Sequence, residues 1–352
     1  MAILLLLAAC SAPSIDPGEF ERSLPAAREL APAAQEAAKD KAARALVAAE
    51  AGRRDEAQQF AEDALAVDPR QGRAHAALGL LAMARAQAES PPTLRLWRAA
   101  EGHLRRGAVA APADAEVQLA LARFFAADGH GRAALDVLDR LLLREPEQVA
   151  ALRLAGVLAY EAAEERRARS YLTRLLAREP GNAVALYRLA QCEATIAARG
   201  TDAQARAAGY ERAATVFSAC RDLVPDDIEA ILGEAAARLA AHDQIGKQGD
   251  PAQLRRALAL YQQAAALAGD RPEPSHGEGV VQELLANVEA AVAAYQRALD
   301  VQPNFVPSLL NLAALRAEGG DQPAAKALWA RARKLEVTPS EAKALDKLLA
   351  DG

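Results

Sequence analysis

The chain has 352 residues, a formal net charge of −5, and a composition that is 52% hydrophobic but only 4% aromatic. The slight excess of acidic residues excludes the broad basic surface with which proteins bind nucleic acid. Alanine supplies much of the apolar share, and strand-length runs of β-branched or aromatic residues are nearly absent. We therefore expect an all-α protein, built either as two domains or as one extended repeat array.

The first predicted element is a short apolar leader. Residues 4–10 read LLLLAAC, a run that is too short to span a bilayer and that ends in small residues, as secretion signals do. Residues 7–10 (LAAC) resemble the lipobox of bacterial lipoproteins, which implies cleavage before Cys10 and acylation of that cysteine. We predict a signal peptide over residues 1–9 and a membrane anchor through lipid on Cys10. The alternative is a chance apolar start on a cytoplasmic protein.

Residues 10–35 are predicted to form a flexible tether between this anchor and the folded part of the chain. The segment contains four prolines, Pro13, Pro17, Pro25 and Pro32, and proline-rich segments are extended rather than compact. Ser11, not aspartate, follows the cysteine. In enterobacterial lipoproteins this resemblance implies sorting to the outer membrane, so we expect the chain to lie in the cell envelope and face the periplasm.

From residue 36 to residue 337 the chain repeats with a period of about 34 residues. Pro112, Pro146 and Pro180 are spaced at this interval, and each separates two apolar helical stretches, because proline ends one helix and sets the turn to the next. In register with the prolines, one position is alanine in every repeat: Ala57, Ala100, Ala134, Ala168, Ala213, Ala257, Ala291 and Ala325. A second position is always small: Ala45, Gly79, Ala122, Gly156, Ala190, Ala235, Gly279 and Ala313. A third is large in all repeats but the first: Ala61, Leu104, Leu138, Leu172, Phe217, Tyr261, Tyr295 and Trp329.

This pattern resembles the tetratricopeptide repeat (TPR), a helix–turn–helix unit with small residues at positions 8 and 20, a large residue at position 24 and proline at position 32. The small residues allow the two helices of a repeat to cross closely, and the large residue fills the adjacent gap. The resemblance implies a TPR solenoid, a right-handed superhelix of about eight repeats.

Two departures from the regular period are expected to change the array locally. Three repeats carry insertions between their first and second helices, near residues 88–95, 197–207 and 242–252. These insertions are either tolerated surface additions or a partner-specific edge. The final segment, 338–352, is predicted to be a capping helix with Thr338 as its N-cap and Pro339 as its first residue, which covers the last apolar face of the array.

Catalytic signatures such as GxSxG, HExxH, Walker A and GxGxxG are absent from the sequence, and so are CxxC pairs. We therefore predict a protein that is not an enzyme, with no cofactor, no metal and no evident small-molecule substrate. Cys192 and Cys220 lie in the fifth repeat at positions where the family uses small apolar residues. They either replace alanine or form a disulfide between the two helices.

The family resemblance also implies where a partner would bind. The first helices of successive repeats line a concave groove, and the middle repeats place arginine, tyrosine and glutamine at groove positions: Arg123, Arg153, Tyr160, Tyr187 and Gln191. Arginine offers forked donors to carboxylates, and tyrosine offers contact area with a polar end. We expect a scaffold or assembly lipoprotein that binds protein segments in this groove, with pilus and secretion machines as candidate assemblies by analogy of architecture. The alternatives are a cytoplasmic TPR adaptor without a lipid anchor and a passive structural spacer.

Overall fold

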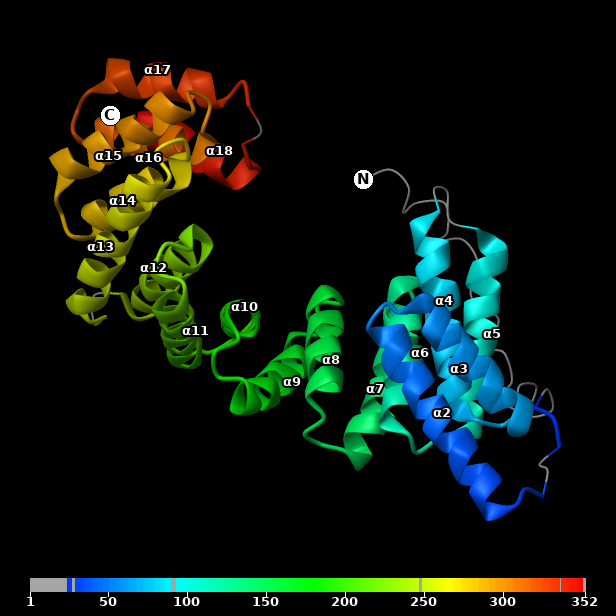
Figure 1. The fold of residues 1–352 in the computed structure, drawn as a ribbon. Helices are drawn as coiled ribbons and strands as arrows, with labels where there is room; N and C mark the ends of the chain where they lie inside the picture. Colours follow the sequence, from blue (N-terminus) through cyan, green and yellow to red (C-terminus); the bar gives the residue numbers. More distant parts are fainter. Residues whose placement is uncertain (1–23, 27–28, 90–92, 247–248, 336, 351–352) are drawn as a thin grey trace. The chain divides into compact units, whose positions relative to one another are not determined.

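A computed structural model of the chain shows α-helices joined by short turns. It describes residues 24–26, 29–89, 93–246, 249–335 and 337–350. No β-strand occurs within these ranges, which confirms the all-α prediction. Cys10 and the rest of the predicted signal and tether up to residue 23 lie outside the described residues. The chain divides into two compact units after Arg178, and each unit is described by itself (Figure 1).

Unit 1, which ends at Arg178, contains four antiparallel helix pairs in its described part. We call the first helix of a pair the A helix and the second the B helix. The pairs are α2 (Pro32–Glu50) with α3 (Arg54–Val67), α4 (Gly72–Ala88) with α5 (Leu94–Ala110), α6 (Ala115–Ala127) with α7 (Gly131–Arg144), and α8 (Val149–Glu161) with α9 (Glu165–Arg178). Each A helix packs against its own B helix, and α2, α4 and α6 also contact the A helix of the next pair.

Unit 2, which begins at Glu179, contains four further pairs and one additional helix in its described part. The pairs are α10 (Ala183–Ala198) with α11 (Ala203–Leu223), α12 (Ile228–Ile245) with α13 (Pro251–Leu267), α14 (Pro272–Leu284) with α15 (Val288–Val301), and α16 (Val306–Glu318) with α17 (Gln322–Ala332). The additional helix, α18 (Pro339–Ala350), contacts both α16 and α17.

The first and the last described helices both begin at a proline. α2 begins at Pro32, before the predicted start of the array at residue 36. Proline suits the first position of a helix because its fixed φ is helical and an N–H at that position would have no partner within the helix. α18 takes the place of the predicted capping helix. Its Ala342 packs against the last buried cluster, and its Asp346 Oδ1 accepts a hydrogen bond from Trp329 Nε1 at 2.8 Å.

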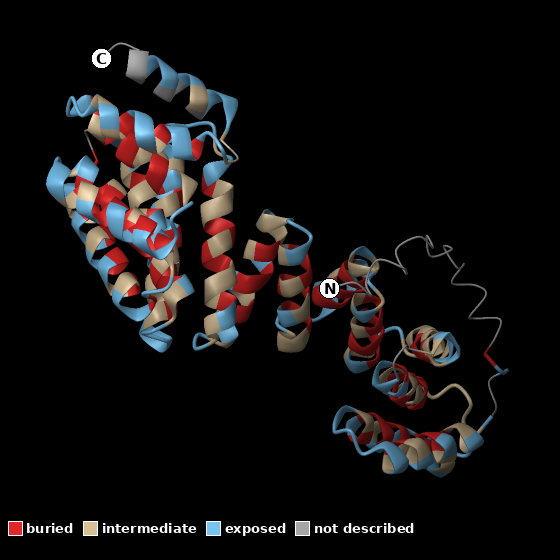
Figure 2. Ribbon diagram, turned by 90° about the horizontal axis from the view of Figure 1, so that it is seen from above, coloured by how far each residue is buried: buried red, intermediate tan, exposed pale blue. Residues whose placement is uncertain are grey.

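The core of each unit lies along the contacts between A and B helices, where buried side chains alternate with exposed ones (Figure 2). The predicted pairing of a small residue at position 8 with a large one at position 24 is present. A Cβ added to Gly279 would lie 2.5 Å from the ring of Tyr295, and one added to Gly156 would lie 2.8 Å from Leu172. These distances are below ordinary carbon contact, so the helices cross only because the glycine has no side chain.

A second glycine position supports the aromatic residues of unit 2. A Cβ added to Gly233 would meet the ring of Phe217 at 2.5 Å, and one added to Gly277 would meet the ring of Tyr261 at 2.3 Å. In both cases the glycine belongs to the repeat that follows the aromatic residue. The rings of unit 2 therefore fill space between successive repeats as well as within one repeat.

The A–B turns of the regular repeats depend on one residue with positive φ. Gly52, Gly129 and Gly320 take this role with φ between 73° and 80°, and Ala163 and Ala286 take it with φ of 54° and 60°. A left-handed conformation costs roughly 1–2 kcal/mol for a residue with a Cβ and little for glycine. The two alanines are therefore local sites of strain in otherwise regular turns.

The insertions lengthen helices rather than forming long loops. The A helices α6 and α8 of regular repeats have 13 residues, whereas the A helices α4 and α12 of repeats with an insertion have 17 and 18. In the fifth repeat the B helix, α11, is the long one, with 21 residues. In the lengthened α5, Trp97 donates a hydrogen bond to Asp128 of the next repeat, and its ring packs on Phe124 with centroids 5.2 Å apart. The start of α5, just after the first insertion, therefore contributes to the contact between two repeats. No helix in the described part of the chain is both long and apolar enough to cross a membrane.

Candidate partner-binding faces

The residues predicted to line one groove fall in two units and are described as two faces. Arg123, Arg153 and Tyr160 lie on A helices of unit 1, and Tyr187 and Gln191 lie on α10 of unit 2. In unit 1, the contacts α2–α4, α4–α6 and α6–α8 join the A helices into one row. In unit 2, α12 contacts both α10 and α14.

Arg123 is already engaged within its own unit. Its Nη1 lies 2.9 Å from Oε1 of Glu50, at the end of α2, and the two side chains are 40% and 37% exposed. The pair therefore links the third repeat to the first. Its exposure allows water and salt to screen it, so a bound carboxylate could compete with Glu50.

A second ion pair fixes the edge of the same row of helices. Arg73 Nε lies 2.6 Å from Asp114 Oδ2, and Arg73 Nη2 lies 3.2 Å from Glu116 Oε2. Asp114 also caps α6, since its side chain accepts from the backbone N–H groups of Glu116 and Val117. The hydrogen bond to Asp114 raises the pKa of Arg73 above its usual value. Arg73 therefore acts as a brace between two repeats.

Arg153 and Tyr160 lie on one side of α8, since residues seven apart return to nearly the same face of a helix. Arg153 is exposed and Tyr160 is half-buried. Val157, four residues after Arg153, is also half-buried on this side. The surface thus combines a cationic group, an aromatic ring and an aliphatic side chain within about three helical turns.

In unit 2, Tyr187 is directed toward its own repeat. Its ring meets Phe217 edge-on at 5.8 Å between centroids, and its hydroxyl accepts a hydrogen bond from Gln191 Nε2 at 2.9 Å. Both side chains are half-buried. These two residues therefore contribute to packing as well as to the surface of α10.

Cys192 and Cys220 are both buried thiols and do not form the disulfide considered from the sequence. Sγ of Cys220 lies 3.4 Å from the carbonyl oxygen of Ala183, at the start of α10. Nine residues separate Ala183 from Cys192, which corresponds to about 13 Å along the helix axis. A disulfide requires Cα atoms within about 7 Å, so the two thiols occupy different levels of the helix pair and take the place of small apolar residues.

Two histidines of unit 1, scattered in the sequence, meet in the structure. Nε2 of His75 lies 3.0 Å from the carbonyl oxygen of Pro69, which can only accept, so this nitrogen carries the proton. Nδ1 of His75 then accepts a hydrogen bond from Nδ1 of His103 at 3.3 Å. Burial lowers the pKa of His75 and, together with the neighbouring His75 and Arg106, lowers the pKa of His103 to about 4. Both rings are therefore neutral near neutral pH.

A buried ion cluster joins three helices of unit 2. The carboxylate of Glu234 is 2% exposed and lies 2.7 Å from Arg221 Nε and 2.6 Å from Arg238 Nη2. Gln253 accepts from Arg238 at 2.8 Å. The two guanidinium groups satisfy a carboxylate that would be costly to bury alone, and Gln253 in turn accepts from one of them. Nothing in the sequence singled out Glu234, because the cluster is completed by Arg221 of α11 and Gln253 of α13, which lie at irregular distances from it in the sequence.

A shallow hollow lies on unit 2, apart from the predicted residues. It has a volume of about 500 Å³ and is lined by Glu193, Ala208, Glu211, Arg212, Thr215 and Val216. The Nε of Arg212 lies 3.3 Å from the carboxylate of Glu193. Among the described residues, no group of three or more His, Cys, Asp or Glu side chains is arranged to hold a metal ion.

The sequence matches no protein-family model and no curated protein. Solved structures are similar in fold. The C-terminal part of a TPR repeat-containing protein from Cytophaga hutchinsonii aligns over 76% of this chain and 98% of its own, with a TM-score of 0.51 and 15% identity. The fold is a TPR solenoid.

Two other TPR proteins align over smaller parts of this chain. YrrB, a TPR protein with an unusual peptide-binding site, covers 58% of this chain and 95% of its own at a TM-score of 0.48 and 16% identity. Residues 41 to the end of MamA from Desulfovibrio magneticus RS-1 cover 53% of this chain and 94% of their own at a TM-score of 0.45 and 19% identity. The alignment with the Cytophaga hutchinsonii protein confirms the TPR fold predicted from the proline period and the small and large positions, and the identities are too low to transfer a partner.

Proposed function

We propose that this TPR protein is a non-enzymatic interaction scaffold and that the A-helix row of unit 1 binds segments of other proteins. The observation that carries the proposal is the continuous contact of α2, α4, α6 and α8. This row presents Arg123, Arg153 and Tyr160 on successive repeats of one unit. A segment lying across the row can therefore contact several repeats at once.

The residues of this row suit an exchangeable interface. The pair between Arg123 and Glu50 is exposed on both sides, and such pairs stabilise a fold by only about 0–1 kcal/mol. A carboxylate of an arriving segment can replace Glu50 at small cost, because the guanidinium fork holds either group. Tyr160 supplies contact area with little loss of conformational freedom.

The test is site-specific crosslinking in cells, with a photoreactive residue in place of Arg153 on α8. The matched control places the same residue at Arg132, which is an exposed arginine on the B helix α7. We expect a discrete crosslinked partner at position 153 and none at position 132. The crosslinked segment, made as a synthetic peptide, should bind the purified chain.

The double variant Arg123→Ala with Arg153→Ala decides whether the row itself binds the peptide. We expect its affinity to fall at least about tenfold, as for loss of central arginines in other interfaces. Unchanged affinity in the double variant contradicts the proposed face. Failure of both positions to crosslink any protein favours a passive spacer.

We further propose that the scaffold is an outer-membrane lipoprotein that faces the periplasm and serves an assembly such as a pilus or secretion machine. The support is the sequence LAAC at residues 7–10 with Ser11 after it, and the assembly is an analogy of architecture. Metabolic labelling with an alkyne fatty acid should label the wild-type chain and leave Cys10→Ala unlabelled. Recovery of an unlabelled, full-length wild-type chain from the cytosol contradicts the location and favours a cytoplasmic adaptor.

A further inference from the structure

The C-terminal end of unit 2 differs in charge from the rest of the chain. Residues 321–352 contain six Lys and Arg against five Asp and Glu, whereas residues 1–320 contain 36 Lys and Arg against 42 Asp and Glu. All six basic side chains of this end are exposed: Lys326, Arg331, Arg333, Lys334, Lys343 and Lys347. We call these six residues the basic end.

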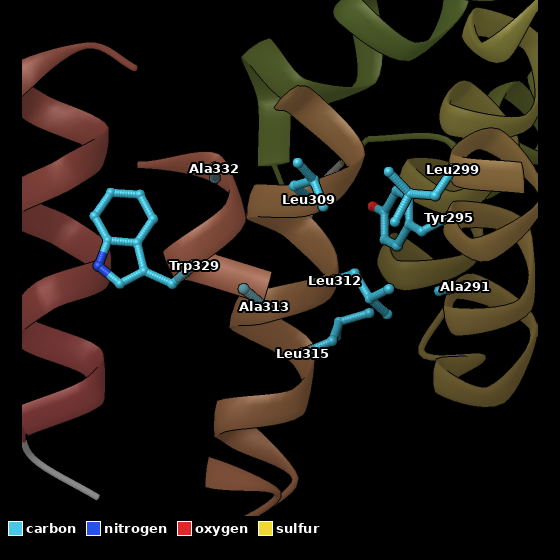
Figure 3. Close-up of a cluster of buried hydrophobic side chains, with 9 residues drawn as sticks. All are labelled: Ala291, Tyr295, Leu299, Leu309, Leu312, Ala313, Leu315, Trp329 and Ala332. Carbon is cyan, nitrogen blue, oxygen red and sulfur yellow. The ribbon is translucent and has the colours of Figure 1, made fainter. Parts of the chain in front are cut away.

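Two helices hold the basic end together. Lys326 lies on α17, one turn before Trp329, and Arg333 is the residue that follows the helix; the guanidinium of Arg333 lies 5.8 Å from the Trp329 ring. The Trp329 indole points toward α18 (Figure 3), where its Nε1 donates to Asp346 at 2.8 Å. Lys343 precedes Asp346 by about one turn of α18, so Arg333 and Lys343 lie near the same contact between the two helices, whereas Arg331 donates to the carbonyl oxygen of Pro303 at 2.7 Å.

The carboxylate of Asp346 forms no ion pair with the lysines of the described residues, although it still carries its charge. Asp346 accepts the hydrogen bond from Trp329, and in the described part of the chain none of the four lysine side chains takes part in an ion pair. Elsewhere the chain relies on arginine for its basic residues, and no lysine occurs between Lys41 and Lys247. Four of the seven lysines of the chain therefore lie at this one end.

The choice of lysine indicates the kind of surface that the basic end fits. An arginine fork suits one carboxylate in fixed geometry, as in the pair between Arg123 and Glu50. A lysine ammonium is a strongly hydrated point charge without such directionality. Several exposed lysines on neighbouring helices match a dense, laterally mobile layer of phosphate groups better than a single acidic peptide.

We propose that the basic end docks on an anionic phospholipid bilayer through the headgroups of acidic lipids. Each lysine near such a surface contributes about a factor of five in binding, so clusters of four to eight basic residues suffice for reversible attachment. The rest of the chain is acidic and is repelled by the same surface. The attachment is therefore end-on, through α17 and α18, and it is independent of the binding of protein segments by unit 1 and of any lipid on Cys10.

The experiment is cosedimentation of the full chain with vesicles of phosphatidylcholine that contain or lack phosphatidylglycerol. Every protein carries Cys10→Ala so that no acyl group can anchor it. We expect binding to the anionic vesicles only, and loss of that binding at high salt. The variant Lys326→Gln, Lys334→Gln, Lys343→Gln and Lys347→Gln should bind at least about 100-fold more weakly.

A control variant removes the same number of charges from other exposed helix surfaces. It carries Arg132→Gln, Arg140→Gln, Arg255→Gln and Arg256→Gln, all at exposed positions on B helices. We expect it to bind within about twofold of the parent chain, and thermal melts should show that both variants remain folded. The proposal is overturned by equal loss in both variants, by unchanged binding of the lysine variant, or by capture on immobilised poly-glutamate without binding to vesicles.

Discussion

The crossing of α14 and α15 gives the sharpest test of how this solenoid is packed. In Gly279→Ala, the added Cβ would lie 2.5 Å from Cε1 and 2.6 Å from Cδ1 of Tyr295. The ring is fully buried, and its hydroxyl is bonded to Glu283 at 2.9 Å and to Asn311 at 3.0 Å, so it cannot move aside. Overpacking of this kind costs about 1–3 kcal/mol, and alanine regains about 1 kcal/mol of helix propensity. We expect a net loss of up to about 2 kcal/mol.

The same substitution elsewhere should have the opposite sign. At Gly102 in α5, an added Cβ would approach only the flexible end of Arg106, at 3.4 Å, so Gly102→Ala should raise stability by up to about 1 kcal/mol. A double variant, Gly279→Ala with Tyr295→Leu, should recover most of the loss, because the third repeat has this combination of alanine and leucine in Ala122 and Leu138, both fully buried.

Hydrogen exchange of α14 and α15, measured by mass spectrometry, is the suitable assay, because repeat arrays open locally and need not unfold in one step. Urea titration followed by circular dichroism gives the global effect. Two results would show that the close crossing does not hold the repeat together. One is that the amides of α14 and α15 exchange as slowly in Gly279→Ala as in wild type, and the other is that Gly279→Ala stabilises the chain as much as Gly102→Ala does.

Three further predictions rest on single features of the two units. The pKa of His103 is about 4 in the folded chain, against 6.5 in the unfolded chain, so only the unfolded state takes up this proton as the pH falls from 6.5 to 4. The free energy of unfolding should therefore drop by roughly 2 kcal/mol over that window, and by less in His103→Asn, which thermal melts at about pH 7 and about pH 4 would measure. Ala163→Gly and Ala286→Gly should each raise the free energy of unfolding by about 0.5–1 kcal/mol, and with it the urea midpoint, because both alanines have positive φ. A lower urea midpoint would contradict a left-handed residue in these turns. Glu234→Ala should lower the free energy of unfolding by about 3–5 kcal/mol, because it leaves two largely buried arginines without their carboxylate. Asp300→Ala, which removes an exposed carboxylate, should change it little, and equal effects of the two substitutions would show that the cluster is not buried.

The pairing of helices could be predicted because its determinants recur at fixed spacing. Position 8 and position 24 of a repeat meet within one helix pair, so the match of Gly156 with Leu172 or of Gly279 with Tyr295 is visible as a period in the sequence. The prolines mark the ends of the B helices for the same reason. Local rules of this kind are repeated eight times in register, which made the fold recognisable from one sequence.

The surroundings of the candidate residues could not be predicted in this way. Arg123 pairs with Glu50, which is 73 residues away in sequence, and the pairing depends on how two A helices pass across a third. The two cysteines share a repeat but occupy different levels of it. The sequence indicated insertions, and the structure places them in longer helices, because alanine-rich segments continue an existing helix more readily than they form a loop.

The sequence by itself determined the helix pairs, their order and the small and large residues at each crossing, because these depend on contacts between positions at a constant separation. Only the tertiary structure decided which polar groups meet: the ring pair of His75 and His103, the buried carboxylate of Glu234, and the indole and carboxylate that link α17 with α18. Such contacts join side chains from different helices at irregular separations, and their stability comes from burial and distance, which a one-dimensional period does not contain.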